Sequence, residues 1–254
     1  MTTPAVRTTW RPFGGFNVKG VPAMSQRQVL HDLRIIRRNV VVASLQEFKH
    51  SRYWSWMRRA LPRTGRQPWR SYPDGYRGPR SSQPVIWRAR VYDLVEGRQR
   101  ELHGDQGAIS QARYVTAALL RDRATGLRCW YVSAHFVVRG DQPSDTERRR
   151  TLLEQDLQEF ELFLDQLADT GHPIVGELDA NLPGSQAHRM PQVAGNGIRR
   201  VRYLGRRGIE YAFVVDGSDV SVETRNVREV ADARLYTDHE GRVFGHRLVV
   251  RRAR

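Results

Sequence analysis

Apolar residues in this chain fall into short strand-like runs and longer stretches with helical spacing. A strand-like run covers residues 13–18, and behind it Ser25, a favourable N-cap residue, precedes apolar side chains at helical spacing. The β-branched run Val40–Leu45 follows. This order predicts a strand, a helix and a second strand. Glu47 would then lie just past the carboxyl end of the second strand, an edge where α/β sheets tend to bind ligands.

The second half of the chain combines one long helical pattern with several more strand-like runs. Residues 113–120 and 129–136 are strand-like and are joined by a turn-like Arg-Ala-Thr-Gly sequence. Between Thr146 and Ala168, leucines and phenylalanines form one apolar face, which predicts the longest helix. Further strands are predicted at residues 85–87, 91–95, 173–178, 209–215, 220–222 and 246–250. Strands outnumber helices and no internal repeat is evident, so we expect one mixed α/β domain over residues 1–254.

Residues 49–84 form a basic aromatic insert that lacks this regularity. We expect a short aromatic helix there, followed by a long surface loop. Between Lys49 and Arg80 the chain has nine positive side chains and one acidic one, with aromatic residues interleaved. Arginines that neutralise phosphates and aromatic rings that stack on bases are typical of nucleic-acid binding. For Trp54 and Trp56 we expect core packing. The nucleic-acid contacts are predicted at Arg63, Arg66, Arg70 and Arg77, although such arginines can also form an ordinary solvated face.

The composition is that of a globular protein with a strong positive charge. Of the 254 residues 39% are apolar and 27% charged, and the formal net charge is +15. This charge favours a polyanionic partner, with nucleic acid first and an anionic membrane surface second. Cys129 is the only cysteine, which excludes an intramolecular disulfide and a zinc site built on several cysteines. No signal peptide or membrane-spanning run is evident, so we expect a soluble cytoplasmic protein. The sequence predicts no particular protein partner.

Polar residues of the types that handle phosphate and hard cations follow many of the predicted strands. They are Asn17, Glu47, His135, Asp179 with Asn181, Glu210, and Asp238 with His239. One such residue alone has an ordinary explanation, because a carboxylate after a strand is usually a turn residue. Their repetition at so many strand ends indicates a functional site.

From Asn17 to His239, the order of these motifs resembles the DNase I-like endonuclease/exonuclease/phosphatase superfamily. The family's strand-end Asn, Gln-Glu, His, Asp-x-Asn, Ile-Asp-Tyr and Ser/Thr-Asp-His motifs are matched by Asn17, Gln46-Glu47, His135, Asp179-Ala180-Asn181, Ile209-Glu210-Tyr211 and Thr237-Asp238-His239. Two departures are visible: Glu210 replaces Asp, and Gly176 lies three residues before Asp179. The resemblance implies a four-layer α/β sandwich, in which two mixed β-sheets pack face to face with helices outside.

The same resemblance implies Mg²⁺-dependent hydrolysis of a phosphodiester, with Mn²⁺ as a substitute metal. Mg²⁺ takes oxygen ligands and usually only one or two carboxylates. Glu47 is the first candidate ligand and Asp238 the second, and Asn17 would support the metal or the phosphate. His239 would be the base that activates the attacking water, oriented by Glu210.

The remaining motif residues would bind and orient the phosphate. By resemblance, Asp179 and Asn181 align the water and the phosphate, and His135 donates to a non-bridging oxygen. Arg113 resembles a phosphate-contacting position of the family, with an ordinary surface arginine as the alternative.

A metal-dependent nuclease is therefore the leading function, and two alternatives stay open. One is a phosphatase or phosphodiesterase acting on a small or lipid-linked phosphate, which the same catalytic residues would support. The other is a nucleic-acid-binding protein that kept the fold and lost activity through the change at Glu210.

Overall fold

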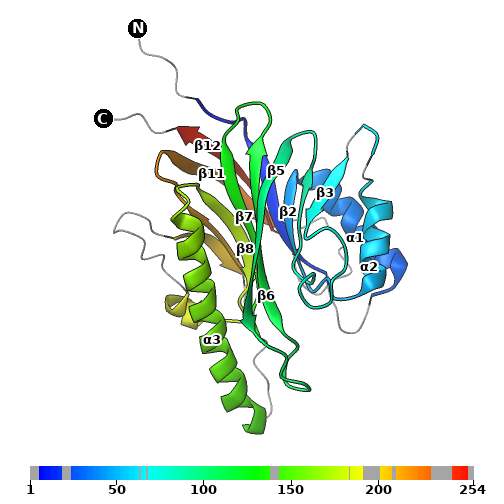
Figure 1. Cartoon of the computed structure of the whole chain (residues 1–254), viewed down its shortest axis with the longest axis vertical. Coiled ribbons are helices and arrows are strands. Elements are labelled where there is room, and N and C mark those ends of the chain that lie inside the picture. Colours follow the sequence, from blue (N-terminus) through cyan, green and yellow to red (C-terminus); the bar gives the residue numbers. More distant parts are fainter. Residues whose placement is uncertain are drawn as a thin grey trace.

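The computed structural model describes residues 6–18, 24–62, 64–66, 68–137, 143–182, 184–190, 201–207, 210–229 and 242–250. Two six-stranded sheets pack face to face, and helices cover their outer faces (Figure 1). This arrangement confirms the predicted four-layer α/β sandwich.

The first sheet has the strand order β11-β12-β1-β2-β4-β3. These strands are β1 (Arg11–Asn17), β2 (Val42–Gln46), β3 (Trp69–Tyr72), β4 (Val85–Arg88), β11 (Val220–Glu229) and β12 (Arg242–Val250). Strands β1 and β2 are parallel, and helix α1 (Gln26–Asn39) connects them. Ser25 begins this helix with a capping box, since Gln28 and Ser25 exchange side-chain and backbone hydrogen bonds. Helix α2 (Ser51–Ala60) packs beside α1 on the outer face.

The second sheet has the order β5-β6-β7-β8-β10-β9. Its strands are β5 (Tyr92–His103), β6 (Arg113–Asp122), β7 (Arg128–His135), β8 (Ile174–Asp179), β9 (Arg202–Arg207) and β10 (Glu210–Val215). Strands β7 and β8 are parallel and are connected by α3 (Pro143–Ala168), which covers the outer face; the short 3₁₀ helix η1 (Gly184–Arg189) follows β8. Each sheet thus contains one parallel strand pair connected by a helix.

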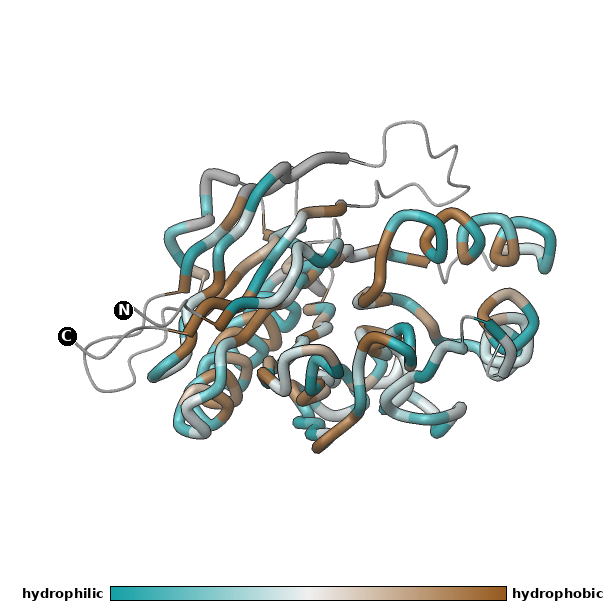
Figure 2. Tube along the Cα trace, turned by 90° about the horizontal axis from the view of Figure 1, so that it is seen from above, coloured by the Kyte–Doolittle hydropathy of each residue, from teal (hydrophilic) through white to brown (hydrophobic). Residues whose placement is uncertain are grey.

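The buried apolar side chains between the layers form three clusters. Because strand side chains alternate between faces, Val175 of β8 packs between the sheets, whereas Leu178 packs under α3. Figure 2 shows that hydrophobic and hydrophilic residues alternate along the helices, as expected for helices with one buried face. None of the described helices combines the length and apolarity that a membrane span requires.

The structure differs from the predicted elements mainly in the polar strands. The surface loop expected after α2 is interrupted by β3, and the irregular stretch before residue 210 contains β9. Strand β5 extends to His103 instead of ending at Val95. Trp54 is buried as predicted, at 3% exposure, and Trp56 packs partly against the same cluster.

The buried His246 should make the stability of the fold sensitive to acid. It packs between the sheets with its Nε2 2.7 Å from the Tyr131 hydroxyl, and burial lowers its pKa to about 4. The unfolded chain, with a histidine pKa near 6.5, binds more protons between these values, so stability falls as pH drops from about 6.5 to 4. A lowering of this size corresponds to about 3 kcal/mol at the acid end.

We expect urea unfolding of the wild type to show this loss of free energy between pH 6.5 and 4. The variant His246→Phe cannot titrate at this position, so its unfolding free energy should fall by about 3 kcal/mol less over the same range. Parallel curves for the two proteins would mean that other groups cause the acid sensitivity.

Candidate active site

The site lies where the carboxyl ends of the two parallel strand pairs meet. Strands β1 and β2 end side by side at Asn17 and Gln46, and β7 and β8 end side by side at His135 and Asp179. The two pairs belong to different sheets, and a hydrogen bond of 3.0 Å from Asn17 Nδ2 to Asp179 Oδ2 joins them. The helical connections explain this geometry, because a parallel pair presents both of its carboxyl ends at one edge of the sheet.

Asp179 is the best-connected carboxylate of this cluster. It is 2% exposed and accepts from Asn17 at one oxygen and from the backbone N–H of Asn181, at 3.1 Å, at the other. His135 Nε2 lies 3.6 Å from the Asp179 oxygen that Asn17 contacts. These contacts fix the direction in which the carboxylate points.

Arg113 determines how His135 is protonated. The Arg113 Nη1 lies 3.1 Å from His135 Nδ1, and because a guanidinium can only donate, Nδ1 must accept. The proton of the neutral ring is therefore on Nε2, which faces Asp179 and lies 3.9 Å from Glu47 Oε1. Arg113 itself is 6% exposed, so it is not the ordinary surface arginine considered as an alternative. Burial lowers the pKa of Arg113, while the nearby Glu47 carboxylate opposes this effect.

Glu47 occupies a strained backbone position at the mouth of the cluster. Its φ is 58°, which is uncommon for a residue other than glycine, and Asn181 shares this feature with a φ of 51°. Such strain concentrates at functional sites. Lys49, which sequence reasoning did not assign to the site, has its Nζ 3.8 Å from Glu47 Oε2. Burial lowers the pKa of Lys49, as does the charge of Arg113.

The motif at Glu210 is only partly visible. Glu210 is buried and lies opposite Asp179 in the antiparallel pairing of β10 with β8, so the two residues are cross-strand neighbours. Asp238, His239 and Arg63 lie outside the described residues. The pairing of Glu210 with His239 therefore stays a prediction.

The donor atoms beside Asp179 fit a small hard cation. Asn17 is 2% exposed, and its side-chain carbonyl oxygen has no hydrogen-bond partner among the described residues. A buried amide oxygen without a partner is costly, and a cation would satisfy it. With the Glu47 carboxylate it would form an all-oxygen donor set of the kind that Mg²⁺ prefers. Within the described part of the chain no group of three or more His, Cys, Asp or Glu side chains is arranged around a common metal position.

Among the described residues, the predicted arginines Arg66 and Arg70 lie toward one end of the sheet and Arg77 toward the other. Arg66 and Arg70 are exposed, and Arg70 pairs opposite Trp87, away from the strand ends that form the site. Arg77 and Arg80 are exposed in the loop that returns to β4, where the backbone N–H of Phe48 donates to Ser82 O at 2.9 Å. The Arg80 guanidinium carbon lies 5.7 Å from the ring centroid of Tyr114, the neighbour of Arg113. Only the second pair is therefore positioned beside the site.

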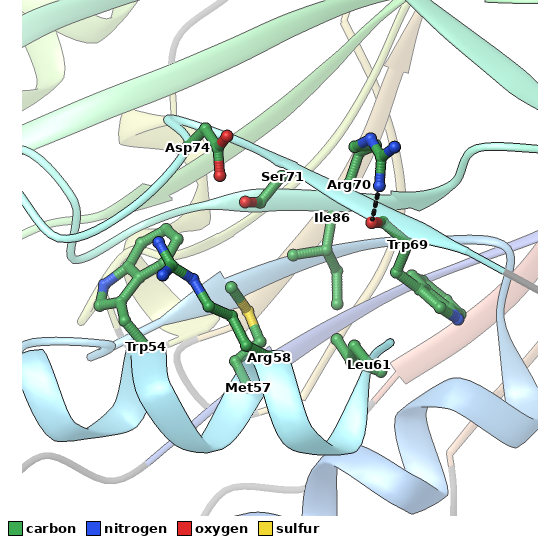
Figure 3. A pocket seen from close by; sticks show the side chains of 9 residues that line it. All are labelled: Trp54, Met57, Arg58, Leu61, Trp69, Arg70, Ser71, Asp74 and Ile86. Atoms are coloured by element: carbon green, nitrogen blue, oxygen red, sulfur yellow. Dashed lines mark hydrogen bonds between the residues drawn. The ribbon is translucent and has the colours of Figure 1, made fainter. Parts of the chain in front are cut away.

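Trp54 and Trp69 of the insert are part of the core and form no exposed stacking surface. Figure 3 shows a pocket between α2 and β3 with Trp54 on the helix and Trp69 on the strand. The pocket encloses about 20 Å³, and the two side chains are 3% and 2% exposed. That volume suits about one water molecule, so neither ring offers a free face to a base.

No family model matches the sequence, and no curated protein matches it. Solved structures match over nearly the whole chain. Three of them serve as examples. An endonuclease/exonuclease/phosphatase from Bacteroides vulgatus is 16% identical with a TM-score of 0.65. D. rerio TDP2 complexed with single strand DNA product is 14% identical with a TM-score of 0.60. The mannosyl-6-phosphatase Bt3783 of Bacteroides thetaiotaomicron is 12% identical, also with a TM-score of 0.60. Each match covers 94% of this chain and 99% of the other. These similarities confirm that the chain has the fold of the endonuclease/exonuclease/phosphatase superfamily.

Proposed function

We propose that this protein is a metal-dependent phosphodiester hydrolase that acts on nucleic acid. The observation that carries the proposal is the convergence of Glu47, His135 and Asp179 at the meeting strand ends, with Arg113 buried behind them. Carboxylates, an imidazole N–H and a guanidinium within a few ångströms of each other form the combination that phosphoryl transfer requires.

The metal would be held by Glu47 and the Asn17 carbonyl oxygen, together with Asp238 as the resemblance implies. A bound Mg²⁺, or Mn²⁺ in its place, supplies Lewis-acid stabilisation of the negative charge that develops on the phosphoryl oxygens.

The chain's own groups would bind the phosphate and orient the attacking water. His135 presents its Nε2–H toward the cluster and can donate to a non-bridging phosphoryl oxygen, and the buried Arg113 charge favours an anion there. Asp179, fixed by Asn17 and the Asn181 backbone, can accept a hydrogen bond from one O–H of the water and so align it. His239 is the proposed base that removes the water's other proton, with Glu210 holding its ring.

Two observations favour nucleic acid over a smaller phosphate. The net charge is +15, and exposed arginines, Arg77 and Arg80, lie on the loop beside the site. The DNA-bound TDP2 structure is an example of this fold with a polynucleotide product. The mannosyl-6-phosphatase is an example with a sugar phosphate, so a small substrate is the second candidate.

The direct test is incubation with plasmid DNA, single-stranded DNA and RNA in Mg²⁺ or Mn²⁺, with EDTA as the control. Metal-dependent cleavage of one of these polymers supports the proposal. If all stay intact while a small phosphoester is hydrolysed, the small-substrate function replaces it. If nothing is hydrolysed but nucleic acid is bound, the protein is a non-catalytic binder of the same fold.

The double variant Arg77→Gln/Arg80→Gln should weaken binding of the polynucleotide and reduce its salt dependence. Each phosphate contact that is lost should flatten the slope of log K against log [salt] by about 0.7–0.9. Affinities from 50 to 300 mM salt, measured by fluorescence anisotropy, would show this change.

The double variant Arg66→Gln/Arg70→Gln is the matched comparison, because it removes the same charge at the other end of β3. An effect confined to the Arg77/Arg80 variant would place the polymer at the site end only. Equal effects would mean that the polymer follows the whole insert, as the sequence predicts. An unchanged slope in both would contradict nucleic-acid binding by the insert.

A further inference from the structure

A second, positively charged pocket lies beside the candidate active site. It encloses about 120 Å³ between α3 and the segment that follows β8. Its polar lining consists of Arg149 and Arg150 from α3, Gln186 and Arg189 from η1, and Asn181 from the end of β8. The volume is several times the ~30 Å³ that one water molecule occupies, so a tetrahedral anion can enter.

The lining carries excess positive charge. It contains three arginines, and no carboxylate is among the lining residues that the structure describes. Arg189 is ion-paired with the exposed Glu154 and donates to Gln186 Oε1 at 2.9 Å, which offsets one of the three charges. Arg149 and Arg150 contribute two further guanidinium groups to the lining.

Arg149 is also close to the phosphate-binding side of the site. Burial lowers the pKa of Arg113, the Glu47, Asp156 and Asp179 carboxylates oppose this effect, and the charge of Arg149 adds to the lowering.

Two residues connect the pocket directly to the active site. Asn181 lines the pocket, while its backbone N–H donates to Asp179 Oδ1 at 3.1 Å. Val137 also lines the pocket, two residues after His135. Two residues of extended chain span about 7 Å at most, so the pocket borders the strand ends that hold the reacting phosphate.

We infer that this pocket binds a second phosphate group of the substrate, next to the phosphodiester that is cleaved. The inference rests on the proposed function and narrows the substrate class to nucleotides that carry neighbouring phosphates, such as a polynucleotide chain or a nucleoside bisphosphate. Arginine suits this role, because its planar guanidinium donates two parallel hydrogen bonds to a phosphate. A single isolated phosphoester would leave the pocket empty and bind less tightly.

Isothermal titration calorimetry with thymidine 3′,5′-bisphosphate and thymidine 5′-monophosphate tests this directly and requires no turnover. We expect the wild type to bind the bisphosphate at least ~10-fold more tightly, as expected for charge-assisted hydrogen bonds. The variant Arg149→Gln/Arg150→Gln should bring the ratio of the two affinities close to one.

The control variant is Arg148→Gln, which removes a charge from the same helix. Arg148 is exposed, donates to Gln106 Oε1 at 3.3 Å and is not among the residues that line the pocket. It should keep the wild-type ratio. A wild-type ratio near one, or an equal ratio in all three proteins, would overturn the second phosphate site.

Hydrolysis of thymidine 5′-(4-nitrophenyl phosphate), measured in parallel with Mg²⁺, separates this inference from the proposed function. If the protein does not hydrolyse this substrate but binds the bisphosphate more tightly in a way that depends on Arg149 and Arg150, the proposed hydrolase function is contradicted and the second phosphate site is supported. Hydrolysis with no preference for the bisphosphate would support the proposed hydrolase and contradict the second phosphate site.

Discussion

Replacement of Glu47 by glutamine is expected to lower kcat/KM for phosphodiester hydrolysis by about 10³-fold, or about 4 kcal/mol of transition-state stabilisation. Glutamine has the same size as glutamate, and the strain of the positive φ of 58° is the same for both residues. The substitution removes the negative charge of the carboxylate, which could bind a metal and whose Oε2 lies 3.8 Å from Lys49 Nζ. The loss should therefore come with weaker metal binding and an intact fold.

Steady-state kinetics over a Mg²⁺ titration would measure this effect, and circular dichroism would check the fold. Glu223→Gln is the matched control, because Glu223 lies half-exposed on β11 and pairs with Arg247 of β12. Full activity of Glu47→Gln, or wild-type activity in excess EDTA, would contradict the assignment of Glu47 as a metal ligand.

The second large effect is expected for Asp179→Asn. The Asp179 carboxylate accepts from Asn17 Nδ2 and from the Asn181 N–H, and it faces His135 Nε2. An asparagine side chain has one acceptor oxygen and one donor nitrogen, so at least one of these contacts becomes donor against donor. We expect kcat to fall about 10²- to 10³-fold, the range seen when one electrostatic group of an active site is lost.

Because Asp179 is buried, the same change should lower the free energy of unfolding by about 1–3 kcal/mol. Asp219→Asn, at an exposed turn, changes the same chemical group without these contacts. Kinetics and urea unfolding on the three proteins would measure both effects. Wild-type kcat in Asp179→Asn would show that the carboxylate does not take part in the reaction.

The sequence predicted the strand ends that meet at the candidate site, because the signal there is local. Asn17, His135 and Asp179 each follow an apolar run directly, and Glu47 follows one after Gln46. An apolar run ended by a polar residue can be recognised without knowing which strands pair. Helix α1 was equally clear, since the Ser25 cap and the apolar spacing lie within one segment.

Other features depend on contacts between distant segments and were not visible. Strand β3 has four residues among prolines and shows no alternation, and only its pairing with β4 makes it a strand. Strand β5 lies at a sheet edge and is half exposed along much of its length, so its polar sequence resembles a loop. Lys49 was counted with the basic insert, because only the fold brings its Nζ back to Glu47. The second phosphate pocket likewise requires α3 and η1 to lie together.

The hydrogen bond between Asn17 and Asp179 joins residues 162 positions apart, which has a consequence for how the protein is made. During synthesis on the ribosome, β1, α1 and β2 can fold early, since their contacts are close in sequence. Asn17 and Glu47 cannot contact their partners from the other sheet until residue 179 has emerged and β8 has docked. A nascent chain arrested before this point contains only half of the proposed site. If the protein is the nucleic-acid hydrolase proposed above, a chain still on the ribosome lacks the complete site with which it would cut the RNA around it.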